Sequence, residues 1–169
     1  MESTPRREME QLVDWRAAVI AGVVAGLVFL LVQMIGQAMI VGGSIWVFPR
    51  YVAAIVMGEN VLIGDIGAAV ILVGLLVHFV LALIFGLILA AIIHEWELLV
   101  GIVVGALFGL ALYAINYYTL NRFFPWFYPI RNWLDITAHV LFGLTAGAVY
   151  ELLEIERFVA VERADTIED

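Results

Sequence analysis

Four long apolar stretches, separated by short polar segments, dominate the pattern of hydrophobic and polar positions along the chain. They cover about residues 15–41, 67–93, 98–118 and 133–153. As an α-helix, each is long enough to cross a hydrocarbon layer about 30 Å thick. Backbone groups in lipid must bond to one another, so an apolar stretch of this length indicates a helix. The pattern predicts an all-α membrane protein, a bundle of four transmembrane helices.

The segments between these spans carry turn-forming and aromatic residues. In the loop at 42–65, Pro49 suits the first turn of a short helix that lies along the lipid head groups and ends at Gly58. Residues 123–129 form a second aromatic loop, and aromatic rings favour the membrane interface. The link at 94–97 is so short that we expect the second and third spans to be antiparallel neighbours.

Composition supports the membrane class and excludes several kinds of chemistry. Hydrophobic residues make up 64% of the chain and charged residues 14%, against about 45–50% and about 25% in soluble domains. No cysteine is present, which excludes disulfides and cysteine-ligated metals. Acidic residues outnumber basic ones 16 to 8, whereas nucleic-acid binding needs a basic face. The partners we expect are membrane lipids, other membrane subunits or further copies of the chain.

Arginine positions predict the orientation, because positive residues concentrate on the cytoplasmic side. An even number of spans puts the N-terminal segment 1–14 and the acidic tail 154–169 on one side. That side carries Arg6, Arg7, Arg16, Arg157 and Arg163. The other side carries Arg50, Arg122 and Arg131. We therefore expect both terminal segments to be cytoplasmic, with the tail helical at first and frayed towards its end.

Glycines recur within the spans at helical spacing. Small residues let helix backbones approach closely in lipid, so we expect these positions to pack helix against helix. They are Gly22, Gly26, Gly86, Gly101, Gly105, Gly109 and Gly147. His78 precedes Gly86 by eight residues and His139 precedes Gly147 by eight, which favours two tandem two-helix repeats. Chance similarity between apolar sequences is the competing interpretation.

Three features of the sequence carry a family resemblance. They are the paired glycine-rich spans, the two histidine–glycine spacings, and the steps Phe48-Pro49 and Phe124-Pro125. With them the chain resembles small four-helix membrane proteins of bacteria and archaea that have no agreed activity and are sometimes labelled symporter-like. The resemblance implies a four-helix fold in the plasma (inner) membrane of a prokaryote and no mechanism.

Few polar residues lie inside the spans, and they fall at a similar depth in the outer third. They are Gln33, Gln37, His78, Asn116, Asp135 and His139. Polar groups in a membrane tend to face the bundle interior, so we expect these residues to form one polar layer. Asp135 and His139 lie one helical turn apart, and we expect the carboxylate to accept a hydrogen bond from the imidazole.

The sequence offers no nucleophile with a nearby base, and no enzyme activity is predicted. The function we expect is that of a non-catalytic accessory or structural subunit of a larger membrane complex. The polar layer could simply hydrogen-bond the helices together. The alternatives are a quinone held by histidine and glutamine, a b-type haem between His78 and His139, a divalent metal on these two and Asp135, and a small oligomeric transporter. The transmembrane domain that we expect, with all four spans, covers residues 15–153.

Overall fold

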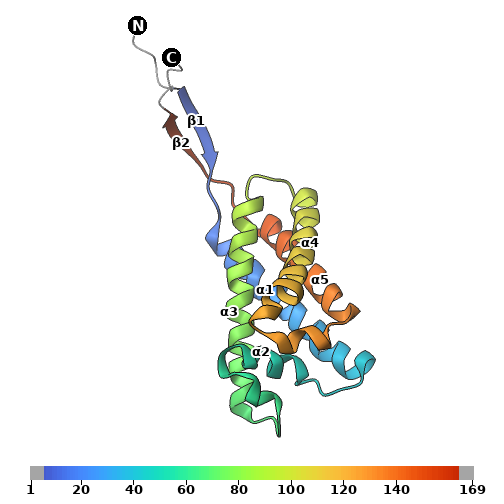
Figure 1. The fold of residues 1–169 in the computed structure, drawn as a ribbon. Coiled ribbons are helices and arrows are strands. Elements are labelled where there is room, and N and C mark those ends of the chain that lie inside the picture. Colours follow the sequence, from blue (N-terminus) through green and yellow to red (C-terminus); the bar gives the residue numbers. More distant parts are fainter. Residues whose placement is uncertain (1–5, 164–169) are drawn as a thin grey trace.

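The computed structural model describes residues 6–163, in which a bundle of long helices carries a two-stranded ribbon at one end (Figure 1). The long helices are α1 (Trp15–Gly36), α3 (Ala68–Ile93), α4 (Leu98–Ala114) and α5 (Trp133–Leu153). Helical turns extend α1 to Val41 and α4 to Arg122, giving four spans of 27, 26, 25 and 21 residues. Their length and apolar composition suit a bilayer, and the protein is a helical multi-pass membrane protein.

Shorter helices accompany these four, so a plain four-helix bundle describes the fold only in part. α2 (Val47–Met57) lies in the first loop, and single turns cover Glu59–Leu62, Leu120–Arg122 and Pro125–Ile130. α2 ends at Gly58 as its sequence predicts, since Gly58 adopts a positive φ of 83°. The position of α2 along the head groups stays a prediction. The helix packs on α3, where a side chain at Gly74 would collide with the backbone of Pro49.

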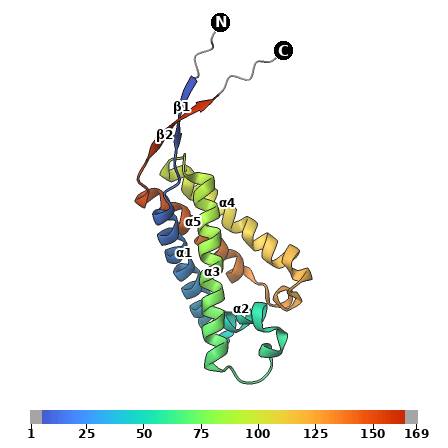
Figure 2. The same cartoon turned by 90° about the vertical axis from the view of Figure 1, so that its left-hand side faces the viewer.

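The spans pack in the order α3, α1, α5, α4, and α1 and α5 fill the space between the outer pair. α1 can sit centrally because Ala17, Ala18, Ala21 and Ala25 form a face of small, buried side chains. α3 and α4 contact each other little and diverge as they leave their link (Figure 2). The expectation that these two spans are antiparallel neighbours therefore holds only beside the link, because the link fixes only where the two helices start.

Glycine contacts close the interfaces between adjacent helices. Gly22 on α1 faces the backbone of Gly86 on α3, and Gly105 on α4 faces Gly143 on α5. The other packing glycines of the sequence also meet a neighbouring helix in the chain: Gly26 meets Ala82, Gly101 meets Glu151, Gly109 meets the His139 carbonyl, and Gly147 meets Gly101. The matching Gly22–Gly86 and Gly101–Gly147 contacts fit two similar halves, and the internal repeat stays a prediction.

The two terminal segments pair as an antiparallel ribbon, which no sequence pattern predicted. β1 (Arg6–Gln11) runs beside β2 (Phe158–Arg163), with Gln11 opposite Phe158. The tail leaves α5 through Glu154 in an extended conformation, so the helical start expected for it is wrong. Pairing with the N-terminal segment supplies the backbone partners that a frayed tail would lack. Residues 1–5 and 164–169 of the predicted terminal segments lie outside the described residues.

Asp14 joins the ribbon to the bundle. Its Oδ1 accepts hydrogen bonds from the backbone N–H groups of Arg16 and Ala17 at 3.0 and 3.1 Å, capping α1. Its Oδ2 accepts from Ile155 N at 3.2 Å, just beyond the end of α5. Donation by the Ala17 N–H lowers the pKa of the Asp14 carboxyl below its ordinary value. The charged carboxylate thus holds the start of α1 and the end of α5 together.

Candidate aromatic cavity

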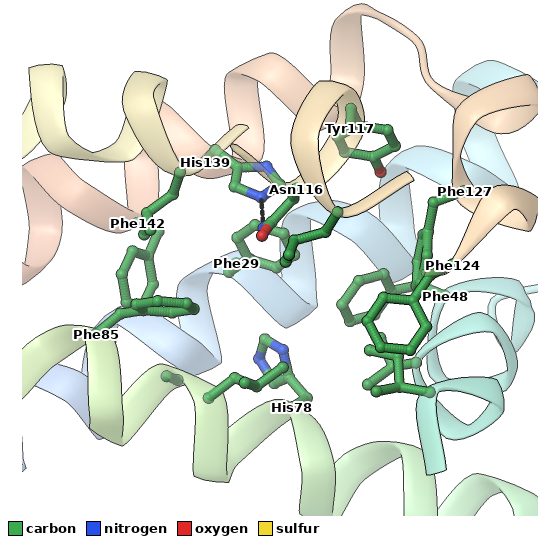
Figure 3. Close-up of a pocket in the computed structure, with 16 residues that line it drawn as sticks. Phe29, Phe48, His78, Phe85, Asn116, Tyr117, Phe124, Phe127, His139 and Phe142 are labelled. Carbon is green, nitrogen blue, oxygen red and sulfur yellow. Dashed lines mark hydrogen bonds between the residues drawn. The ribbon is translucent and has the colours of Figure 1, made fainter. Parts of the chain in front are cut away.

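A cavity of about 180 Å³ lies between α1, α2, α3, α4 and α5, towards the end of the bundle away from the ribbon (Figure 3). Aromatic rings make up much of its wall. They belong to Phe29, Phe48, Phe85, Tyr117, Phe124, Phe127 and Phe142. His78 stands on one side of the cavity, and His139 with Asn116 stands on the other (Figure 3). The wall is thus apolar, with polar groups at two opposed places.

His78 projects from α3 against the backbone of α1. Its Nε2 lies 2.8 Å from the carbonyl oxygen of Gly26. The ring lies 5.5 Å from the centroid of Phe29 and 5.3 Å from that of Phe48. A carbonyl can only accept, so His78 carries its proton on Nε2 and donates it to Gly26.

His139 is held through both of its ring nitrogens. Nδ1 lies 2.7 Å from the backbone carbonyl oxygen of Asp135, one turn earlier on α5. Nε2 lies 3.1 Å from Nδ2 of Asn116 on the last turn of α4. The hydrogen bond that we expected from the imidazole to the Asp135 carboxylate is therefore not formed. The carbonyl of the same residue takes its place, because the carboxylate points to other donors.

Asn116 and Tyr117 reach the cavity from a widened turn. Residues Ile115–Thr119 form a π-helical turn at the end of α4, just as Gln37–Val41 do at the end of α1. Such turns are rare and occur frequently at functional sites, because the extra residue redirects the side chains that follow. Here the turn leaves Tyr117 buried and Asn116 half-buried at the cavity wall.

Asp135 forms a separate polar clamp beside the cavity. Its Oδ1 accepts from Nε2 of Gln33 on α1 at 2.8 Å, and its Oδ2 accepts from the backbone N–H of Asn132 at 2.7 Å. The Asn132 side chain caps the same turn, giving a reciprocal capping box. Gln33 is only 1% exposed and its Oε1 is buried without a partner among the described residues. The clamp joins α1 to the start of α5.

The predicted polar layer therefore divides into two groups. His78, Asn116 and His139 line the cavity, whereas Gln33 and Asp135 form the clamp. Gln37 is buried one turn beyond Gln33 and does not line the cavity.

The sequence analysis did not identify the aromatic residues that line the cavity, although the spacing of two of them from the histidines indicates a shared helical face. Phe85 follows His78 by seven residues and Phe142 follows His139 by three, so each shares its histidine's helical face. Phe48 and Phe124 belong to the two Phe-Pro steps. The loops that carry them fold back onto the bundle as well as contacting the interface.

The metal and haem hypotheses gain no support from this geometry. His78, His139 and Asp135 do not gather, and residues 6–163 contain no group of three or more His, Asp or Glu side chains placed to hold a metal ion. Nε2 of each histidine is already hydrogen-bonded, to Gly26 or to Asn116. Haem ligation by these atoms would have to break both contacts.

Comparisons of the chain with protein-family models, with curated proteins and with solved structures find no match. The resemblance to small four-helix prokaryotic membrane proteins stays a prediction, and the functional argument rests on the cavity.

Proposed function

We propose that this protein is a non-catalytic membrane protein that holds a lipophilic molecule with a single ring in the aromatic cavity. The observation that carries the proposal is the size and lining of that cavity, about 180 Å³ bounded by six phenylalanine rings among other apolar side chains. An engineered apolar protein cavity of about 150 Å³ stays dry and binds benzene. The present cavity thus has room for one six-membered ring with small substituents, and its rings favour edge and face contacts with such a guest.

Access from the bilayer supports the proposal. The cavity is bounded by α3 and α4, the two helices that diverge. Leu81 and Phe85 on α3 and Leu120 after α4 line it and are only half-buried. A guest dissolved in the lipid would pass between these helices without crossing water. The chemistry required is binding alone, since the lining side chains offer no nucleophile and base pair.

The expected result of filling the cavity is loss of this binding. Leu81→Trp adds a large ring at the cavity wall, whereas Leu76→Trp adds the same ring on α3 at a position 65% exposed and outside the lining. Fluorine NMR of 4-fluorotoluene, with the protein in nanodiscs, reports the bound ring by a signal that protein-free nanodiscs lack. We expect the signal in the wild type and Leu76→Trp and at least a tenfold weaker affinity in Leu81→Trp. Equal binding by both variants would refute the proposal.

The accessory or structural role in a larger membrane complex is a second proposal, and the ribbon favours it. A ribbon of two strands is marginal in water on its own, and Met9 and Phe158 on it are 64% and 51% exposed. A partner that covers them would stabilise the ribbon. The packing glycines lend no support, because they are used within the chain. A partner should co-purify from native membranes and be lost with Phe158→Glu; its retention would count against the ribbon as the contact.

The transporter and haem alternatives have less support. The lining residues stop near the middle of the spans, whereas a transport path must continue through the full depth. The haem alternative needs a free nitrogen on each histidine, and both nitrogens of His139 are hydrogen-bonded, to Asp135 and to Asn116. A single ring of quinone size remains compatible with the proposed site, where the polar groups beside it are His78 and Asn116 instead of histidine and glutamine.

We infer that the terminal segments are cytoplasmic and that the membrane is the plasma membrane of a prokaryote. The arginine excess beside α1 and α5 supports the orientation. The cysteine-free sequence makes the test clean, because a single introduced cysteine is the only thiol to label. In intact cells, an impermeant maleimide should label Asn60→Cys and should reach Glu95→Cys only after permeabilisation. The reverse pattern would overturn the orientation.

A further inference from the structure

The hydrogen bonds around the cavity fix which of its polar atoms can accept and which can donate. A neutral imidazole has one donor and one acceptor nitrogen, and the partner of one nitrogen sets the role of the other. In both cavity histidines, one nitrogen faces a backbone carbonyl. The protonation pattern of the whole site follows from these two contacts.

On the α4–α5 side, the acceptor available to a guest is Asn116. His139 donates through Nδ1 to the Asp135 carbonyl, so its Nε2 is an acceptor. That acceptor is used by Nδ2 of Asn116, which fixes the orientation of the amide. The Oδ1 of Asn116 is then an acceptor at the cavity wall, and Figure 3 shows this oxygen on the side towards His78.

On the α3 side, the acceptor is the other nitrogen of His78. Its Nε2 donates to Gly26, which leaves Nδ1 unprotonated. Among the described residues, no hydrogen bond reaches Nδ1 of His78. The two residues that offer an acceptor, His78 and Asn116, thus stand on opposite sides of an otherwise apolar cavity (Figure 3), so a guest between them can meet one acceptor at each end.

We propose that the aromatic cavity selects a ring that donates hydrogen bonds at opposite ends, a phenol or above all a 1,4-diphenol of the quinol class, over the corresponding quinone. This selectivity rests on the proposed function. A quinol hydroxyl can donate to His78 Nδ1 while the second donates to Asn116 Oδ1. A quinone places carbonyl oxygens against the same two atoms, where acceptor meets acceptor and no bond forms. The reduced form is therefore the one held.

Four ring compounds of nearly equal size separate hydrogen bonding from shape. They are p-xylene with no polar group, p-cresol with one donor, 1,4-dihydroxybenzene with two donors, and 1,4-benzoquinone with two acceptors. Each competes with 4-fluorotoluene for the protein in nanodiscs, and its concentration in the lipid is measured in protein-free nanodiscs. Because one hydrogen bond is worth roughly two- to tenfold in affinity, we expect 1,4-dihydroxybenzene to bind roughly tenfold or more tightly than p-xylene, with p-cresol between them and benzoquinone weakest.

Two variants each remove the acceptors on one side of the cavity: His78→Phe on the α3 side, and the double change Asn116→Leu with His139→Phe on the α4–α5 side. His139 is changed together with Asn116 because Asn116→Leu alone would free His139 Nε2 as a new acceptor. Circular dichroism reports whether each variant is folded, and the variant's own affinity for 4-fluorotoluene, which donates no hydrogen bond, is the reference for the other rings. In either variant, 1,4-dihydroxybenzene should bind within about twofold of p-cresol, since the acceptors of only one side are left. If one variant fails to fold, the other carries the test.

The outcomes distinguish this inference from the proposed function. If 4-fluorotoluene binds but p-xylene and 1,4-dihydroxybenzene displace it equally, the donor selectivity is overturned and the proposed function stands. Selectivity that persists in both variants overturns the roles of His78 and Asn116. If 4-fluorotoluene does not bind the wild type, or binds Leu81→Trp as well as the wild type, both proposals fall.

Discussion

Gly143→Leu is expected to force α4 away from α5 and to destabilise the bundle by about 3 kcal/mol or more. A Cβ at this position would meet the carbonyl oxygen and carbon of Gly105 and the backbone nitrogen of Gly109. These are backbone atoms, so no side chain can rotate away to make room. The helices must separate, and separation loses van der Waals contact along the whole α4–α5 interface, the main attraction between helices in lipid.

The matched control for this change is Gly67→Leu. Gly67 precedes α3 with φ −77° and ψ 153°, a conformation that leucine adopts freely, and a Cβ there meets no atom within 4 Å. Unfolding in detergent micelles with increasing SDS, followed by circular dichroism, measures both variants. The Gly67→Leu midpoint should stay near that of the wild type, while the Gly143→Leu midpoint drops sharply. Equal midpoints would mean that α4 and α5 do not pack through these glycines.

Asp135→Ala is expected to cost about 3 kcal/mol, because it removes one buried and one partly buried hydrogen bond at once. The Gln33 Nε2 group would lose its acceptor at a position 1% exposed, and the Asn132 N–H would lose the second half of the capping box. A buried donor left without a partner adds its desolvation cost to the lost bond. The start of α5 would also lose part of its cap.

A double-mutant cycle isolates the contact between the two side chains. Asp135→Ala, Gln33→Leu and the double variant are compared by SDS unfolding, and we expect a coupling of about 1 kcal/mol between Asp135 and Gln33. Thr137→Ala is the control on the same helix, because Thr137 is bonded only to the Trp133 carbonyl of its own turn. It should change stability by less than about 0.5 kcal/mol. Additive effects of Asp135→Ala and Gln33→Leu would contradict the clamp.

The spans were predictable because length and apolar composition decide them without reference to any neighbour. The arrangement of the spans was not predictable in the same way. α3 and α4 are apolar on every side, so their sequences do not indicate which face turns inward. The glycine spacing identified contact positions such as Gly105 but not the helix they meet. The order of the bundle, and the divergence of α3 from α4, depend on the sum of these pairwise contacts.

The sequence predicted which rare polar residues belong to the candidate site. It did not predict how their side chains are arranged. The depth of His78, Asn116 and His139 follows from counting along helices. Whether they meet Asp135 depends on helix rotation and on which backbone carbonyls accept from the imidazoles. One part could have been read from the sequence, since Asn132 and Asp135 stand three residues apart at the start of a span, the spacing of a capping box. That pattern predicts that the Asp135 carboxylate accepts from the backbone at the start of α5.

The terminal ribbon eluded prediction for another reason. Its strands are short and lie far apart in the sequence. Because no hairpin turn joins them, no local sequence signal indicates that Gln11 pairs with Phe158. The alternation of Phe158 to Val161 between larger and smaller apolar residues gives only a weak strand pattern.

The aromatic cavity is the claim on which the functional account stands, and an experimental density map of the protein in nanodiscs with saturating 1,4-dihydroxybenzene tests it most directly. The account predicts ring-shaped density between His78 and Asn116, bordered by Phe29 and open towards the gap between α3 and α4. A map in which α3 and α4 close together and phenylalanine side chains fill this space would contradict it.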